Sequence, residues 1–231
     1  MKKNTEIEVQ DHVADYYVNK RYTNYGLKYH KDIIKGIMDG VSGKILDVGC
    51  GTGVIHDLYP NLDIIGIDVS EGMLSHHKGV HYKMSAEKIL FPDNYFDAVI
   101  CRSVLHHLPD CELALIEIKR VLKPGGKLVC WETNKSWLAE KVRSFTQHGD
   151  HFSEYHHSFS NLDDLIGDHY RINELRYQGF VAYPLFGFPD ILDFSKFLWW
   201  LFWPCHFLDK FLSKIPVIKK LGFAILIKAV K

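Results

Sequence analysis

The sequence predicts an α/β fold in which helices cover both faces of a mostly parallel sheet. Between residues 44 and 133, short runs rich in β-branched and aromatic residues alternate with helical segments, a pattern typical of βαβ units. A glycine-rich turn at residues 49–53 directly follows the first of these runs. The chain has 231 residues, 47% of them hydrophobic and 24% charged, which is the balance of a globular protein rather than a disordered one.

The predicted elements begin with helix. Residues 7–38 carry charged and apolar residues at helical spacing, and predict one or two helices before the first strand. The strands expected next are Lys44–Gly49, Asp63–Val69, His81–Ala86, Phe96–Arg102 and Lys127–Thr133. Helices are expected between them at Ser70–His77, with Ser70 as the N-cap, and at Asp110–Leu122, which ends before a proline and two glycines.

The last third of the chain follows a different pattern. A polar, histidine-rich segment extends from Thr133 to His169, and residues 171–180 and 222–230 predict two further strands. The segment between these strands, residues 181–221, is dense in aromatic residues and is predicted to be an insertion.

Composition excludes several classes of protein. The 28 lysines and arginines balance the 28 aspartates and glutamates, so nucleic acid is not an expected partner. Five cysteines without paired CxxC spacing argue against a disulfide framework and favour a reducing cytoplasm. The N-terminus lacks the apolar segment of a secretory signal, and the longest apolar run, 197–208, falls short of the roughly 20 residues of a spanning helix. No metal site is expected, because the spacing of His148, His151, His156 and His157 matches no zinc pattern.

The segment Ile45–Gly53, ILDVGCGTG, is predicted to carry the chemistry. It is a buried strand that ends in an acid, followed by glycine at every second position, which lets the backbone turn sharply and approach a ligand. Asp68 follows about 20 residues later at the end of the second strand, where an acid can bind ribose hydroxyls. The alternatives are a turn without a ligand and a nicotinamide dehydrogenase, whose fingerprint needs a glycine where this chain has Val54.

Four motifs in order identify a family resemblance. They are ILDVGCGTG, GIDVSEGML, AEKILFPDNYFDAVICRSVLHHLPD and IKRVLKPGGKLV, and they span residues 44–132. This set resembles class I S-adenosylmethionine-dependent methyltransferases, in particular the type 11 group that includes ubiquinone and menaquinone biosynthetic methyltransferases. The resemblance implies a Rossmann-like three-layer sandwich with a mostly parallel seven-stranded sheet whose last strand is antiparallel. We expect one domain over 1–231, made of N-terminal lid helices (1–40), a core (41–180), an aromatic helical insert (181–221) and the last strand (222–231).

The resemblance also implies a binding site for S-adenosylmethionine. The glycine loop would hold the methionine end of this cofactor, Asp68 the ribose, and Val69 with Met73 the adenine. Ser85 stands where the family usually has an acid, so the backbone of the next residue or the following carboxylate would take over that contact. The cofactor-binding residues implied in this way are Tyr17, Asp47, Gly49, Cys50, Gly51, Gly53, Asp68, Val69, Met73, Ala86, Glu87, Arg102 and Ser103.

His106 and His107 are the candidates for catalysis. Each has two interpretations, support of the loop under the cofactor or removal of a proton from the acceptor. A dedicated base is optional, because methyl transfer mainly requires that the nucleophile be aligned and water excluded.

The expected function is methyl transfer from S-adenosylmethionine to a small hydrophobic or lipid-like acceptor, by O- or C-methylation. Acceptor specificity is expected in the insert at 181–221, where lysines accompany the aromatic residues. Such a segment is typical of a lipid or membrane contact, and equally of a hydrophobic cap or dimer face. The alternative function is a non-catalytic cofactor-binding subunit that docks a partner protein through this insert. We expect a cytoplasmic protein, with peripheral contact at a membrane as one outcome.

Overall fold

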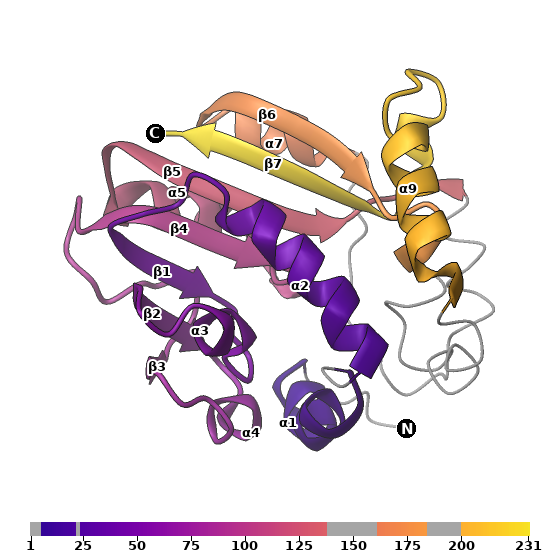
Figure 1. Ribbon diagram of the computed structural model, residues 1–231. Coiled ribbons are helices and arrows are strands. Elements are labelled where there is room, and N and C mark those ends of the chain that lie inside the picture. The colour runs from indigo at the N-terminus through magenta and orange to yellow at the C-terminus, as the bar shows by residue number, and fades with distance from the viewer. Residues whose placement is uncertain (1–5, 22–23, 138–160, 184–199) are drawn as a thin grey trace, which may run out of the picture.

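The computed structural model describes residues 6–21, 24–137, 161–183 and 200–231 (Figure 1). Within these residues one seven-stranded sheet has the order β3-β2-β1-β4-β5-β7-β6. Its strands are β1 (Lys44–Val48), β2 (Asp63–Asp68), β3 (Val80–Lys83), β4 (Phe96–Arg102), β5 (Leu122–Thr133), β6 (Arg171–Gln178) and β7 (Ala224–Val230). The strands from β3 to β5 pair in parallel, while β7 is antiparallel to both β5 and β6. The predicted Rossmann-like fold class is confirmed.

All seven predicted strands are present, and β5 differs most in its limits. It begins at Leu122, five residues earlier than expected, because it includes the proline–glycine–glycine turn. Leu122 pairs with Phe96 and Lys127 with Ala98, so residues 123–126 form an irregularity in the pairing. Gly125 has a φ of 75°, a left-handed conformation that favours glycine. The predicted turn therefore exists, but within the strand rather than before it.

The helices lie mostly where the sequence predicts them. The described helices are α1 (Glu6–Tyr16), α2 (Asn24–Met38), α3 (Val54–Leu58), α4 (Glu71–Leu74), α5 (Cys111–Val121), α7 (Leu162–Gly167) and α9 (Phe202–Leu212), with short turns η1 (Tyr17–Arg21), η2 (Leu105–His107) and η5 (Lys219–Leu221). The predicted N-cap of α4 is confirmed, since the Ser70 hydroxyl accepts from the amide of Met73 at 3.0 Å. This helix ends at Leu74, earlier than predicted.

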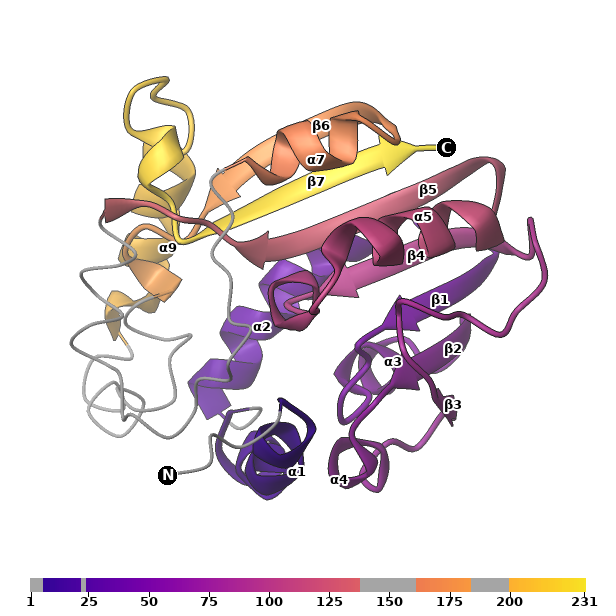
Figure 2. The same cartoon turned by 180° about the vertical axis from the view of Figure 1, so that it is seen from behind.

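Two layers of helices sandwich the sheet. On one face, Ile34 and Ile37 of α2 are fully buried in a cluster with Ile45 and Ile100 of the strands (Figure 1). On the opposite face, α5 and α7 cover the sheet, and Ile118 of α5 belongs to the second core cluster (Figure 2). Because both faces are covered, the central strands are apolar on both sides, which explains their continuous hydrophobic runs.

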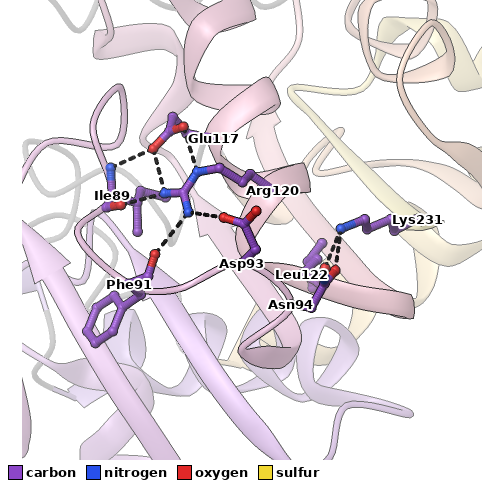
Figure 3. A network of polar contacts seen from close by, with 8 residues as sticks. All are labelled: Ile89, Phe91, Asp93, Asn94, Glu117, Arg120, Leu122 and Lys231. Carbon is purple, nitrogen blue, oxygen red and sulfur yellow. Dashed lines mark hydrogen bonds and ion pairs between the residues drawn. The ribbon is translucent and has the colours of Figure 1, made fainter.

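Arg120 at the end of α5 fixes the connection between β3 and β4 (Figure 3). Its guanidinium donates to the carbonyls of Ile89 and Phe91, at 2.6 and 3.0 Å, and to the carboxylate of Asp93 at 2.7 Å. Glu117, one turn earlier, accepts from the same guanidinium and from the amide of Ile89. Part of the third family motif is therefore held in place by the helix behind it.

Some predictions concern residues outside the described part of the chain. These are the histidines at 148, 151, 156 and 157 and the aromatic residues between 184 and 199. Within the described ranges, no helix combines the length and the apolar character that crossing a membrane requires.

Candidate functional site

The candidate site lies at the carboxyl ends of β1, β2 and β4. Because these strands are parallel, their ends meet at one edge of the sheet and bring Asp47, Asp68 and Arg102 into the same region. The helices α1 and α4 lie beyond this edge (Figure 1). The predicted site residues from the first, second and fourth strands thus come together as the topology requires.

The three glycines of the loop differ in the space around them. All have left-handed φ angles, of 67° at Gly49, 53° at Gly51 and 82° at Gly53. A Cβ added at Gly49 would lie 2.6 Å from Cβ of Val104, and one at Gly53 would lie 2.7 Å from the ring of His77. A Cβ at Gly51 would meet only the sulfur of Met73, at 3.9 Å. Packing therefore requires the outer two glycines, whereas Gly51 borders open space that a ligand can enter.

Asp68 joins the glycine loop to the turn before α4. One of its carboxylate oxygens accepts from the amide of Gly51 and the other from the amide of Ser70, both at 2.9 Å. Burial raises the pKa of Asp68, while these amides and the nearby imidazole of His107 oppose the rise. An ionised carboxylate has about four lone-pair sites, so acceptor capacity remains on Asp68 beyond the backbone amides that it binds, as binding of ribose hydroxyls requires.

Asp47 is a buried acid at the end of β1, with 3% of its surface exposed. Burial raises its pKa to about 7, Arg102 opposes this rise and the charge of Asp68 adds to it. A cationic group of a ligand would stabilise the ionised form of such a carboxyl. The loop that follows contains no basic residue, which suits a cationic cofactor rather than a phosphate.

Glu132, which the sequence did not single out, organises the turn that carries both candidate histidines. It is fully buried at the end of β5 and accepts from the amides of Val104 and Leu105 at 2.8 and 2.9 Å. Its other oxygen lies 2.6 Å from Nδ1 of His106. Burial raises the pKa of Glu132 to about 8, against the effect of these donors. The only sequence signal was an acid at the end of an apolar strand.

The two histidines have different surroundings. His106 is buried against Glu132, whereas His107 is half-buried and acts electrostatically on Asp68. Their ring centroids lie 4.0 Å apart. The structure therefore places His106 at the end of β5 and His107 within electrostatic range of Asp68, and a role of either in proton removal stays a prediction.

The helix α1 is fixed to α4 by Asp11. Oδ1 of Asp11 accepts from the hydroxyl of Ser70 at 2.5 Å and from the amide of Gly72 at 2.8 Å. Next to this contact, Ala14 and Tyr17 pack against Met73. The structure thus brings the predicted lid residue Tyr17 to the predicted adenine residue Met73, and Asp11 is a second residue that the sequence did not indicate.

The remaining predicted cofactor residues lie around this centre. The thiol of Cys50 packs against Gly66 of β2, where an added Cβ would come within 2.7 Å of the sulfur. The carboxylate of Glu87 accepts from the amide of Asp110 at 2.8 Å, so it also holds the start of α5. Ser103 has a φ of 55°, which is uncommon for a residue with a side chain. The other two are Ala86, which is buried, and Val69, which is half-buried.

Comparison with known proteins shows what this part of the chain is similar to. Residues 46–130 match the family model described as a methyltransferase domain. The chain is 33% identical over 117 residues to the ubiquinone/menaquinone biosynthesis C-methyltransferase of Desulfotalea psychrophila, a match that covers 46% of this chain and 48% of that protein. It is 37% identical over 123 residues to the demethylmenaquinone methyltransferase of Staphylococcus aureus, covering 48% of this chain and 51% of that relative.

Residues 46–130 therefore have the sequence of a methyltransferase domain, and this part of the chain is similar to class I methyltransferases of the type 11 family. The methyl donor of this family is S-adenosylmethionine. The crystal structure of a SAM-dependent methyltransferase from Thermotoga maritima has the same fold, with a TM-score of 0.70 at 19% identity, over 98% of this chain and 99% of that one. The chain spans about half the length of the curated relatives it matches.

The site of the methyltransferase domain fits its cofactor. Gly51 leaves the backbone open on the side of Met73, so a ligand can approach it closely. Asp68 offers acceptors for hydroxyl groups, and Asp47 offers a buried carboxyl that a cation would stabilise. The assignment of the glycine loop to the methionine end of S-adenosylmethionine and of Asp68 to its ribose stays a prediction, with which these three features agree.

Proposed function

We propose that this protein transfers the methyl group of S-adenosylmethionine to a small hydrophobic or lipid-like acceptor, by O- or C-methylation. The observation that carries the proposal is the pairing of an open Gly51 with Asp68, which accepts from the amide of Gly51 at 2.9 Å. The acceptor class is supported by the two quinone-related enzymes named above and by exposed aromatic residues on α9. Peripheral contact with a membrane would give the protein access to such an acceptor.

The residues of this chain mainly bind and align the reactants. When bound, S-adenosylmethionine supplies a methyl group attached to a positively charged sulfur. Asp47 and Asp68 hold the polar groups of the cofactor, and Tyr17 beside Met73 excludes water from it. Glu132 fixes residues 104–107, which border the cofactor loop through Val104, so that the acceptor can be aligned.

Proton removal is needed only for an acceptor that is protonated at neutral pH, such as a hydroxyl. His106 and His107 are the proposed groups. Nδ1 of His106 contacts Glu132, so the other ring nitrogen, Nε2, points away from that acid. A general base oriented by a carboxylate has this arrangement. His107 lies nearer the cofactor acid Asp68.

Calorimetric titration with S-adenosylmethionine tests the binding site. Replacement of Asp68 by asparagine removes the charge and one backbone hydrogen bond, so the affinity should fall by about tenfold or more. Asp63→Asn is the matched control, since Asp63 lies on the same strand but is exposed and paired with Lys44. Wild-type affinity in Asp68→Asn would contradict the proposal.

Turnover tests the reaction itself. Formation of S-adenosylhomocysteine is measured with a panel of hydrophobic hydroxyl, ring-carbon and amine acceptors. Turnover with the first two classes is expected, and preference for amines would contradict O- or C-methylation. Tight cofactor binding without turnover of any acceptor would favour the non-catalytic subunit instead.

A further inference from the structure

The helix α9 presents aromatic side chains to solvent. Trp203, Phe207 and Phe211 follow one another at intervals of four residues, so they lie along one side of the helix, and Trp200 precedes them by three. These side chains are 50%, 64%, 62% and 58% exposed, respectively. We call Trp200, Trp203, Phe207 and Phe211 the α9 aromatic surface.

The other side of α9 is anchored in the protein. Phe202 is fully buried, and Cys205 is buried with it in the core cluster that contains α2. The carboxylate of Asp209 accepts from the amides of Val181 and Ala182, at 2.7 and 3.2 Å, close to the end of β6. The orientation of the helix is therefore fixed. Figure 1 shows α9 at one end of the sheet, and the exposed fractions of its aromatic side chains show that they face solvent.

The charges on the segment that carries this surface are mostly positive, and the neighbouring α2 adds an acid, Asp32, 3.7 Å from Nε2 of His206. Residues 200–221, all of them described, include four lysines, at 210, 214, 219 and 220. The only acid in this segment is Asp209, which is buried and bonded to the backbone. A fifth lysine, Lys28 of α2, places its ammonium 4.7 Å from the ring centre of Trp203. Aromatic and basic groups thus share one face without acidic neighbours on its own segment.

This combination indicates the chemistry of the partner. Tryptophan beside lysine is the composition of helices that lie in the interface of an anionic membrane, where rings enter the headgroup region and ammonium groups meet phosphates. α9 has 11 residues, far fewer than the roughly 20 needed to span a bilayer, so it would lie in the membrane plane. A second copy is less suitable, because a two-fold interface would bring the same lysines together.

We propose that the α9 aromatic surface, with Lys210 and Lys214 beside it, docks this protein onto an anionic membrane surface. Docking is a property of the protein alone and requires no turnover. Its link to a lipid-like acceptor rests on the proposed function, since an acceptor dissolved in the bilayer would then be taken up from the membrane.

Sedimentation with lipid vesicles tests the proposal. The full chain should bind vesicles of phosphatidylcholine with phosphatidylserine, and bind phosphatidylcholine alone at least about tenfold more weakly. Phe207→Ala/Phe211→Ala should reduce binding to the anionic vesicles by about tenfold or more. Leu113→Ala/Ile116→Ala is the matched control, because these two side chains are 42% and 47% exposed on α5.

Charge reversal provides a second, independent variant. Lys210→Glu/Lys214→Glu should lower anionic vesicle binding by about tenfold or more, whereas Lys88→Glu, an exposed lysine near the β3–β4 connection, should not. All variants should unfold at the wild-type temperature and bind S-adenosylmethionine normally, which separates loss of docking from failure of the cofactor site.

Three outcomes would overturn the proposal. The wild-type protein could fail to bind anionic vesicles, or both α9 variants could bind them as tightly as the wild type. Sedimentation equilibrium could instead reveal a dimer that Phe207→Ala/Phe211→Ala dissociates, which would assign the α9 aromatic surface to a second copy.

Discussion

Alanine at Gly49 and at Gly51 should separate the fold from the cofactor site. Both positions are left-handed, so each alanine costs about 1 to 2 kcal/mol in backbone strain. At Gly51 little else changes, because the new methyl group would meet only Met73 at 3.9 Å. At Gly49 it would overlap Val104, which adds about 1 to 3 kcal/mol for overpacking.

These free energies convert into unfolding temperatures. For a chain of this length, each kcal/mol shifts the midpoint by about 2 to 4 °C. Gly51→Ala should therefore lose about 2 to 8 °C, and Gly49→Ala about 4 to 20 °C. The order reverses for cofactor affinity. The methyl group at Gly51 occupies the space left for the ligand, so S-adenosylmethionine should bind about tenfold more weakly or worse, a loss of about 1.4 kcal/mol.

Calorimetric titration and thermal unfolding of both variants measure the two effects. Gly36→Ala is the control, because Gly36 lies in α2 with nothing within 4 Å of an added Cβ. This helical substitution should raise stability by about 0.5 to 1 kcal/mol and leave cofactor affinity unchanged. The reasoning is refuted if Gly51→Ala binds the cofactor like the wild type, or if it unfolds at a lower temperature than Gly49→Ala.

Two further predictions concern buried acids. The pKa of Asp47 is raised by burial from 3.8 to about 7, so its contribution to stability is greatest at low pH and declines as pH rises from about 4 to about 7. A cationic cofactor favours the ionised form of Asp47, so binding near pH 6.5 should release protons. Calorimetry in buffers of different ionisation enthalpy measures this release, which should disappear in Asp47→Asn. Binding heats of the wild type that do not depend on the buffer would contradict the prediction. Glu132→Ala should leave the amides of Val104 and Leu105 unpaired, at about 1 to 3 kcal/mol each, whereas Glu132→Gln can still accept from both. Chemical denaturation compares the two, and equal stability would argue against this role.

The fold was largely predictable because its signals are local. Alternating apolar runs and turn residues indicated all seven strands, and Ser70 was recognised as an N-cap from its own neighbourhood. The predicted start of β5 was wrong, because the pairing of Leu122 with Phe96 of the neighbouring strand decides where β5 begins.

The candidate site was predictable only in part. The glycine loop and Asp68 are close in sequence, and their spacing is a property of one βαβ unit. Glu132 and Asp11 were missed because their partners are distant, Val104 for the first and Ser70 for the second. Arg120 similarly holds Ile89 and Phe91, residues that the sequence had shown only as part of a family motif.

The sequence by itself determined the class of fold, since hydrophobic periodicity and backbone conformational freedom are encoded residue by residue. Its four motifs carry the resemblance to class I methyltransferases, and that resemblance implies the cofactor. Only the tertiary structure decided which glycine borders open space. Gly49 and Gly51 are alike in the sequence and in their φ angles, and they differ because Val104 fills the space beside one and not the other. That difference arises from side chains far along the chain, which local patterns do not record.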